Sequence, residues 1–426
     1  MTSVILGAIP FDGHVAPMLG VARRFVELGI RVRFLTGAAY AERVRATGAE
    51  FLPLPADADR VDADVVRETD GRRLSGAAAL RDNLTRVFIE PAAGQYRALL
   101  EAIAAGPVDA VLTETGFSGA AGLLRTPGHP PVVVCGIIPL GVTSRDTAPF
   151  GLGLSPDASP LGRIRNRALA WFMRRVMFRE NQEAADALMR ELTGEDMHGF
   201  FLDWSREADA IAQFTVPSFE YPRSDAPANL RFFGPVSRLE PSTVATPDWW
   251  SELDGTRPIV HVTQGTLAND DLGELIRPTL DALAGDDVLV VVSTGGRPVS
   301  ALGELPANAR AAEMLPYAEL MPRVDVFVTN GGYGGLHYAL ESGVPMVVAG
   351  DTEDKPETAA RVAWSGVGVN LRTGTPTASA IGSAVHEVLA DGRYARAAAR
   401  IGADIQASPG VDGLAELVRA LTPARA

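Results

Sequence analysis

The chain has 426 residues, a formal net charge of −13 and 46% hydrophobic residues. Its length exceeds one ordinary hydrophobic core and predicts two domains of roughly 200 residues each. The negative charge disfavours nucleic-acid binding and attachment to an anionic lipid surface, because both surfaces would repel the protein. A small molecule is therefore the expected ligand.

Residues 4–9 form an apolar stretch without a basic leader or a small-residue cleavage site, so no signal peptide is predicted. No apolar run reaches the roughly 18–20 residues that a membrane span requires. The single cysteine, Cys135, excludes an internal disulfide and a cysteine-based zinc site. We expect a cytoplasmic protein.

Short β-branched runs alternate with longer helical segments, which is typical of βα units around a buried parallel sheet. A first series of strands is expected at residues 4–9, 32–36, 110–113 and 132–137. A second series is expected at residues 259–263, 288–293, 324–329 and 346–349. Two such series predict an α/β protein with two facing Rossmann-like, doubly wound parallel-sheet domains.

Residues 215–247 contain six prolines and lack helical or alternating periodicity, which predicts a linker. We expect an N-terminal domain at 1–215, a linker at 216–247 with the boundary near Gly234, and a second domain at 248–405. A helix within 406–426 is expected to cross back to the first domain. Ligands of open α/β sheets bind beyond the carboxyl ends of the strands, so the site should lie between the domains.

The loop GAIPFDGHVAP, residues 7–17, places His14 between the first strand and a helix expected at 17–28. A neutral imidazole there can take a proton from a hydroxyl if a carboxylate holds its other ring nitrogen. Asp109 and Glu114, beside a later strand, are the candidate carboxylates. From position alone, a histidine that only caps or packs at the helix start is an equally good interpretation. The glycine spacing does not match G-x-G-x-x-G, which disfavours a dinucleotide-dependent dehydrogenase.

Glycine-rich loops follow two strands of the second series. Gly265 and Thr266 come directly after residues 259–263, and the run NGGYGG, residues 330–335, opens a helix expected near Leu336. Exposed amides at a helix N-terminus can bind a diphosphate without a metal ion. The alternative is a tight turn with no ligand. The candidate diphosphate ligands in this run are Asn330, Gly332, Gly334 and Gly335.

The loop GDTEDKPE, residues 350–357, follows the last strand of the second series. Its Asp354 and Lys355 can hydrogen-bond sugar hydroxyls. On the residues alone, a solvated charge run that caps the helix at 356–365 is slightly favoured.

An apolar ligand pocket is expected in the first domain, within residues 56–88 and 139–178. Its candidate liners are Phe11, Phe117, Phe150 and Trp171, although core packing is the simpler interpretation of the aromatic cluster at 171–178. The D-x-D patterns at 57–59 and 62–64 resemble a cation-binding element, but no predicted strand delivers them to a site. We therefore expect surface loops and no metal.

Taken together, these stretches resemble the family 1 glycosyltransferases of the GT-B fold, especially bacterial enzymes that glycosylate macrolides and other natural products. The resemblance covers nearly the whole chain. Its most specific portion is FVTNGGYGGLHYALESGVPMVVAGDTEDKPETAARV, residues 327–362, which is similar to the nucleotide-sugar signature of the family. The resemblance implies inverting, metal-independent transfer of a hexose from a UDP- or dTDP-sugar to a hydroxyl of a small apolar acceptor, without a cofactor.

By resemblance, His14 falls on the catalytic base and Glu114 on its partner acid, with Asp109 preceding it. The resemblance assigns Gly265 and Thr266 to the diphosphate, Leu315 and Pro316 to the nucleobase, and Asp354 and Lys355 to the sugar hydroxyls.

Three residues depart from the family pattern. Asn330 replaces a histidine that donates to the phosphates, Lys355 replaces a commoner glutamine, and Tyr338 replaces a glutamate that holds the ribose of uridine donors. The choice between uridine and thymidine donors stays open, as does that between monomer and homodimer. The alternative functions are a nucleotide-sugar epimerase or hydrolase of the same fold and a non-catalytic nucleotide-sugar-binding protein.

Overall fold

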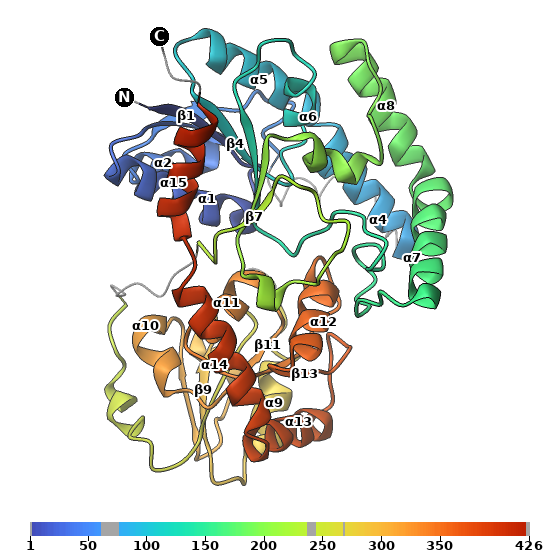
Figure 1. Ribbon diagram of the computed structural model, residues 1–426. Helices are drawn as coiled ribbons and strands as arrows, with labels where there is room; N and C mark the ends of the chain where they lie inside the picture. Colours follow the sequence, from blue (N-terminus) through green and yellow to red (C-terminus); the bar gives the residue numbers. More distant parts are fainter. Residues whose placement is uncertain (1, 61–75, 237–243, 267–268, 423–426) are drawn as a thin grey trace.

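Two parallel sheets organise the protein in the computed structural model, which describes residues 2–60, 76–236, 244–266 and 269–422. The sheets belong to separate α/β domains, with the N-terminal domain above the C-terminal domain in Figure 1. This architecture confirms the predicted fold class.

The N-terminal sheet has seven strands in the order β3-β2-β1-β4-β5-β6-β7, and all neighbours are parallel. The strand order reverses at β1, with β2 and β3 on one side of it and β4 to β7 on the other. The carboxyl ends of β1 and β4 therefore lie side by side, with Gly7 opposite Thr113. Ligands of doubly wound sheets bind at such a switch point. The strands are β1 Ser3–Gly7, β2 Arg31–Thr36, β3 Glu50–Pro53, β4 Ala110–Glu114, β5 Val132–Gly136, β6 Ala210–Gln213 and β7 Leu230–Phe232.

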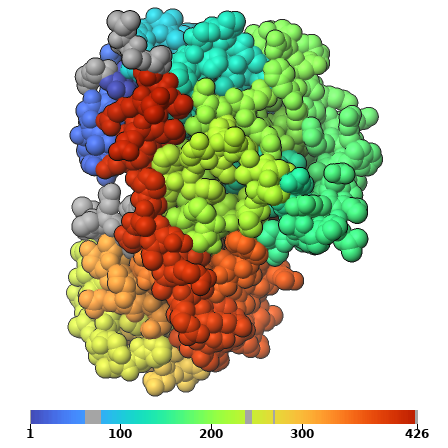
Figure 2. Space-filling view, viewed as in Figure 1, coloured from blue at the N-terminus to red at the C-terminus, as the bar shows by residue number. Residues whose placement is uncertain are grey.

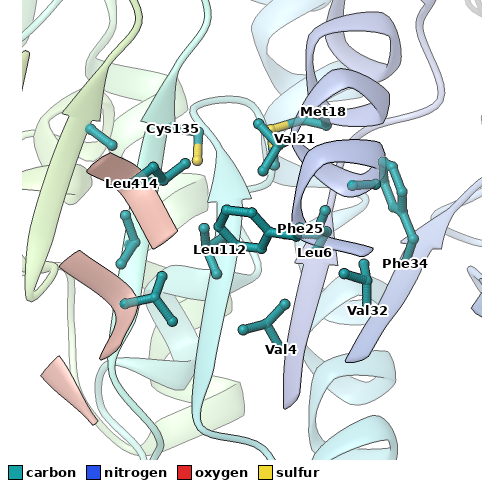
Figure 3. Packing of buried hydrophobic residues seen from close by; sticks show 14 of the residues in the cluster. Val4, Leu6, Met18, Val21, Phe25, Val32, Phe34, Leu112, Cys135 and Leu414 are labelled. Carbon is teal, nitrogen blue, oxygen red and sulfur yellow. The ribbon is translucent and has the colours of Figure 1, made fainter. Parts of the chain in front are cut away.

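Helices cover both faces of this sheet because alternate residues of each strand point to opposite sides. Val4 and Leu6 of β1 pack with Phe25 of helix α1, whereas Ile5 lies in a separate cluster with Phe117 on the other face. Figure 3 shows the first of these clusters. The helices are α1 Asp12–Glu27, α2 Ala41–Arg45, α4 Gly76–Leu84, α5 Ala92–Ala104, α6 Ala120–Leu123, α7 Pro160–Phe172 and α8 Arg179–Thr193.

Helix α1 begins at Asp12, five residues before the predicted start. Pro17 lies inside the helix rather than at its first position. Pro17 is the sixth helical residue, so it removes the backbone bond to Gly13 O while the helix continues through it. Because the helix begins at Asp12, His14 is part of the first turn of α1.

The C-terminal sheet has six parallel strands in the order β10-β9-β8-β11-β12-β13. Its strands are β8 Ile259–Thr263, β9 Leu289–Ser293, β10 Ala309–Ala312, β11 Val326–Thr329, β12 Met346–Val348 and β13 Gly368–Asn370. Its helices are α9 Ile276–Leu283, α10 Tyr317–Leu320, α11 Tyr333–Glu341, α12 Lys355–Ser365, α13 Ala378–Ala390 and α14 Arg393–Gln406. Helix α11 begins before the predicted Leu336, so Gly334 and Gly335 lie in its first turn.

The N-terminal domain extends into the segment that was predicted to be linker. Strand β7 pairs with β6, and Phe233 is buried in the core of the N-terminal domain. The expected domain end at residue 215 was therefore too early, because a three-residue strand among prolines has no periodicity of its own.

The chain returns to the N-terminal domain through helix α15, Gly410–Leu421. Leu414, Ala415 and Val418 are buried in the same core cluster as Phe25, and Leu414 is visible there in Figure 3. Gly410 N donates to Phe233 O at 2.8 Å where the two crossing segments meet. Figure 2 shows this C-terminal segment on the surface of both domains. Within the described residues, no helix is long and apolar enough to cross a membrane.

Candidate active site

His14 and Glu114 come together at the carboxyl ends of β1 and β4. His14 Nδ1 lies 2.8 Å from Glu114 Oε2, and the Glu114 side chain is fully buried whereas His14 is 20% exposed. Glu114 also accepts the backbone amides of Ile9 at 3.1 Å and Gly116 at 2.5 Å. The Glu114 oxygens act as acceptors toward these backbone amides, so we assign the Nδ1 proton to His14 as a further donor. The other ring nitrogen is then the basic one.

Asp109 lies at the opposite end of β4 from Glu114. Its Oδ2 accepts Ser3 N at 2.8 Å, at the amino edge of the sheet. Five residue steps along the strand separate Asp109 from Glu114, which corresponds to a distance of roughly 16 Å between their backbones. The prediction that Asp109 belongs to the catalytic group is therefore wrong, and its role is to close the edge of the sheet.

The loops after β8 and β9 are held together by Asn269. Its Nδ2 donates to Gly265 O at 3.0 Å, to Thr294 O at 3.1 Å and to Gly295 O at 3.2 Å. Gly265 has φ +76°, a conformation that favours glycine, and Thr266 beside it is exposed. The predicted diphosphate loop therefore presents an open backbone and an accessible hydroxyl, and Asn269 is a supporting residue that the sequence reasoning missed.

The second glycine loop joins β11 to the N-terminus of α11. Asn330 Nδ2 donates to Gln264 O at 2.6 Å, which connects this loop to the loop after β8. Gly331 adopts φ +91°, and Gly332 is the N-cap of α11 without a side-chain cap bond. Gly334 and Gly335 form part of the first turn, where neither adds a side chain over the helix N-terminus. These amides and the helix dipole suit an anionic ligand.

Asp354 and Lys355 start helix α12 at the edge of β12. Asp354 is the N-cap residue of α12. It interacts electrostatically with His14, which lies in the other domain. Burial raises the pKa of the Asp354 carboxyl to about 6, and the Lys355 ammonium opposes this rise. Lys355 Nζ donates to Glu353 Oε2 at 2.6 Å and to Thr352 Oγ1 at 3.1 Å. The residues predicted to contact the sugar and the residue predicted to be the base therefore lie near each other across the domain boundary.

The expected nucleobase residues lie next to a buried histidine. Leu315 is 4% exposed and belongs to the domain core, and Pro316 is the N-cap of α10. Tyr317 follows, and its hydroxyl lies 3.1 Å from His261 Nε2. Burial lowers the pKa of His261 to about 4, so it is neutral and structural. Tyr338 packs edge-on against Tyr317, with ring centroids 5.8 Å apart.

The four predicted acceptor liners have different surroundings. Phe11 lines a small pocket of about 10 Å³ together with Ile9, Pro10 and Val87, and its ring centroid is 6.1 Å from that of His14. Phe150 is half-buried in the segment after β5. Phe117 is 0% exposed in the core, so the prediction that it lines a pocket is wrong. Trp171 is 61% exposed on α7 and lies neither in the core nor in that pocket.

The described residues contain no cluster of three or more His, Cys, Asp or Glu side chains arranged to hold a metal ion. Asp57 instead pairs with Arg97, and Asp59 Oδ2 accepts Ala38 N at 3.0 Å. The second D-x-D pattern, residues 62–64, falls outside the part of the chain that the structure describes. Both carboxylates of the first D-x-D pattern therefore have partners within the protein.

A buried charge network links the domains and was not predicted. Arg361 of α12 is 0% exposed and donates to Glu220, in the segment between β6 and β7, at 2.7 Å and to Glu357 at 2.9 Å. Burial opposes ionisation of Glu220, but the charges of Arg361 and Arg223 outweigh burial and lower the pKa of Glu220. Arg361 and Glu357 lie within the recognised signature, yet only their contacts reveal this role.

Comparison with known proteins agrees with this geometry. Residues 277–421 match the family described as erythromycin biosynthesis protein CIII-like, C-terminal domain. The chain is 41% identical to 4'-demethylrebeccamycin synthase of Lentzea aerocolonigenes, over 98% of this chain and 99% of that protein. It is 36% identical to UDP-glycosyltransferase 2 of Phaeomoniella chlamydospora, over 99% and 96%.

Two solved structures share the fold. The calicheamicin glycosyltransferase CalG4 superposes with a TM-score of 0.75 at 22% identity, covering 100% of this chain and 99% of that one. The spinosyn rhamnosyltransferase SpnG in complex with thymidine diphosphate gives a TM-score of 0.68 at 19% identity, covering 98% and 100%.

The two Rossmann-like domains have the GT-B fold, with a histidine–glutamate pair in one and a glycine-rich helix N-terminus in the other, and the relatives make the chain a sugar-transferring enzyme. With whole-chain relatives at 41% and 36% identity, the chain belongs to the natural-product glycosyltransferases, which transfer a sugar from a nucleotide-sugar donor to a small acceptor.

Proposed function

We propose that the protein transfers glucose from UDP-glucose to a hydroxyl of a small apolar natural product, with inversion at the anomeric carbon and without a metal ion. The observation that carries this proposal is the 2.8 Å contact between His14 Nδ1 and the fully buried Glu114 carboxylate. Such a pair is the arrangement required for a general base that takes a proton from a hydroxyl.

The reaction follows from these positions. The acceptor oxygen attacks the anomeric carbon as His14 Nε2 takes its proton, and the bond to the diphosphate oxygen breaks on the opposite side. Glu114 stabilises the imidazolium that forms. The departing diphosphate gains negative charge, which the amides at the start of α11 and the Thr266 hydroxyl stabilise in place of a metal. One displacement converts an α-linked donor into a β-glycoside.

The uridine donor is supported by relatives that are named for it. UDP-glycosyltransferase 2 of Phaeomoniella chlamydospora is 36% identical and UDP-glucosyltransferase 1 of Beauveria bassiana is 35% identical. Tyr338 replaces the expected ribose-binding glutamate and packs against Tyr317. This replacement is the feature of the chain that would favour a thymidine donor instead. The same whole-chain similarity supports transfer over the epimerase, hydrolase and binding-protein alternatives.

The test is a calorimetric titration with UDP, UDP-glucose, dTDP and dTDP-glucose in the presence of EDTA, followed by turnover with a panel of phenols and macrolactones. We expect tighter binding of the uridine series, undiminished turnover in EDTA and a β-linked product by NMR. The proposal is contradicted by an α-linked product or by turnover that stops in EDTA and returns with Mg²⁺.

His14→Ala tests the assigned base in the same assays. We expect turnover to fall by about 10²–10⁴-fold while UDP affinity stays unchanged, because the imidazole acts on the acceptor proton. Glu114→Gln retains the shape of the partner but removes its charge, so its loss should be smaller. Undiminished turnover in His14→Ala would show that another group is the base.

A further inference from the structure

The segment that follows β5 is bound by a glutamate of the opposite domain. Gly151 N and Gly153 N both donate to Glu357 Oε1 at 2.9 Å, and Glu357 is 4% exposed. Glu357 lies on α12 of the C-terminal domain, whereas Gly151 and Gly153 lie in the N-terminal domain. One buried carboxylate oxygen therefore fixes two amides across the domain boundary. We name residues 141–154 the β5 loop.

The second oxygen of Glu357 connects this contact to the rest of the interface. Glu357 Oε2 accepts Arg361 Nη1 at 2.9 Å, and Arg361 in turn binds Glu220. Glu220 Oε2 accepts Leu140 N at 3.0 Å, at the residue before the β5 loop. The β5 loop is thus held near both ends, by Glu357 of α12 at one end and by Glu220, the partner of Arg361 of α12, at the other. The opposite charges of this network fix one another's positions.

The loop approaches α12 so closely that a side chain would not fit. A Cβ on Gly153 would lie 2.9 Å from Pro356 O, and both Gly151 and Gly153 have positive φ, of +94° and +59°. Pro356 lies in the first turn of α12, directly after Asp354 and Lys355, the expected ligands of the donor sugar. The position of the β5 loop is therefore fixed relative to the sugar-binding end of the donor domain.

The β5 loop carries apolar groups of the kind that an apolar acceptor requires. Phe150 is half-buried, and Leu152 and Leu154 are 39% and 40% exposed. They belong to the segment that leaves the sheet at the same edge as His14 and Glu114, because β5 lies next to β4 in parallel register. Ordering these groups before the acceptor arrives lowers the entropic cost of binding it.

We propose that Glu357 is a positioning residue for the acceptor: it holds the β5 loop, with Phe150, Leu152 and Leu154, against the sugar-binding end of α12. This inference rests on the proposed function in one respect, namely that the molecule bound beside this loop is the acceptor. Glu357 touches neither reacting atom, so its loss should weaken acceptor binding and leave the donor site and the displacement step intact.

The experiment compares Glu357→Ala and Glu357→Asp with the wild-type protein. Asp325→Ala is the matched control, because Asp325 Oδ2 accepts Ile259 N at 2.8 Å within the same domain but at the amino edge of its sheet. Hydrogen exchange of peptides from residues 141–154, UDP affinity by calorimetry, and acceptor KM and kcat with the best acceptor from the phenol and macrolactone panel are measured for each variant.

We expect Glu357→Ala to raise hydrogen exchange of the β5 loop and acceptor KM by about ten-fold, the effect of losing roughly 1.4 kcal/mol of binding. Changes in UDP affinity and kcat should stay within about two-fold, and Glu357→Asp, which keeps the charge, should recover part of the loss. Asp325→Ala should change neither loop exchange nor KM.

Unchanged loop exchange in Glu357→Ala overturns the proposed contact, and raised exchange with unchanged acceptor KM overturns its role in acceptor binding. An equal loss of UDP affinity also overturns it, because the residue would then support the donor site. A wild-type protein that transfers no sugar overturns the proposed function instead, and the exchange measurement still decides whether Glu357 holds the loop.

Discussion

At the scale of single residues, Asp354 is the site residue for which the structure predicts pH-dependent sugar binding. Its pKa is raised to about 6 by burial, so the carboxyl is protonated below that pH and ionised above it. Only the ionised form accepts hydrogen bonds from sugar hydroxyls with both oxygens. The contribution of the sugar to donor affinity should therefore be lost as pH falls through about 6.

The measurement is the UDP-glucose affinity of the wild-type protein divided by that of Asp354→Asn, from pH 7.5 to 5. UDP is not a suitable reference ligand, because its terminal phosphate titrates at about pH 6 whereas the diphosphate diester of UDP-glucose does not. Groups other than Asp354 titrate in both proteins and cancel in the ratio. We expect the ratio to fall about ten-fold, which corresponds to roughly 1.4 kcal/mol. A ratio that stays constant would assign any titration to another residue.

At the scale of elements, the donor site depends on close contact between the loops after β8 and β9. A Cβ on Gly295 would lie 1.9 Å from Gly265 O, and Gly295 has φ +67°. Substitution by alanine must therefore displace the diphosphate loop and also adopt a backbone conformation that costs roughly 1–2 kcal/mol. We expect Gly295→Ala to weaken UDP binding at least ten-fold.

Gly285→Ala is the control for this variant, because a Cβ there meets no atom within 4 Å. Calorimetric UDP affinity should be unchanged in Gly285→Ala. If both variants bound UDP as tightly as the wild-type protein does, the loop after β8 would not belong to the diphosphate site.

At the scale of the whole molecule, Arg361 joins the two domains through two buried carboxylates. Replacing it with methionine removes the cation that Glu220 and Glu357, which are 2% and 4% exposed, share, and leaves Arg223 as the partner of Glu220. Breaking a buried charge network in this way costs about 3–5 kcal/mol. We expect Arg361→Met to unfold at a clearly lower urea concentration than the wild-type protein.

Arg24→Met provides the comparison for an exposed ion pair. Arg24 is 42% exposed and contacts Asp412 of α15 at 2.6 Å, so its loss should cost at most about 1 kcal/mol. The urea midpoint should therefore change little in Arg24→Met. Equal shifts in the two variants would contradict the view that the buried network stabilises the domain interface.

The sequence by itself determined the two-sheet fold and the main strands. Long β-branched runs such as Ile259–Thr263 are buried on both faces, so their composition is sufficient to identify them. Strands β3, β6, β7, β10 and β13 were not predicted; each has three or four residues and depends on its neighbour in the sheet. The family resemblance assigned Glu114 as the partner of His14, and the structure places Glu114 at the end of β4, the strand beside β1.

Only the tertiary structure decided which other residues meet. Asp109 and Glu114 are five positions apart in sequence. Because a strand is extended, they lie at opposite ends of β4 and cannot meet. Phe117 reads as a pocket residue but fills the core, because burial depends on what packs above it. The contact between Glu357 and Gly151 spans 206 positions, a separation at which local patterns carry no information, so it arises only when both domains have folded and docked.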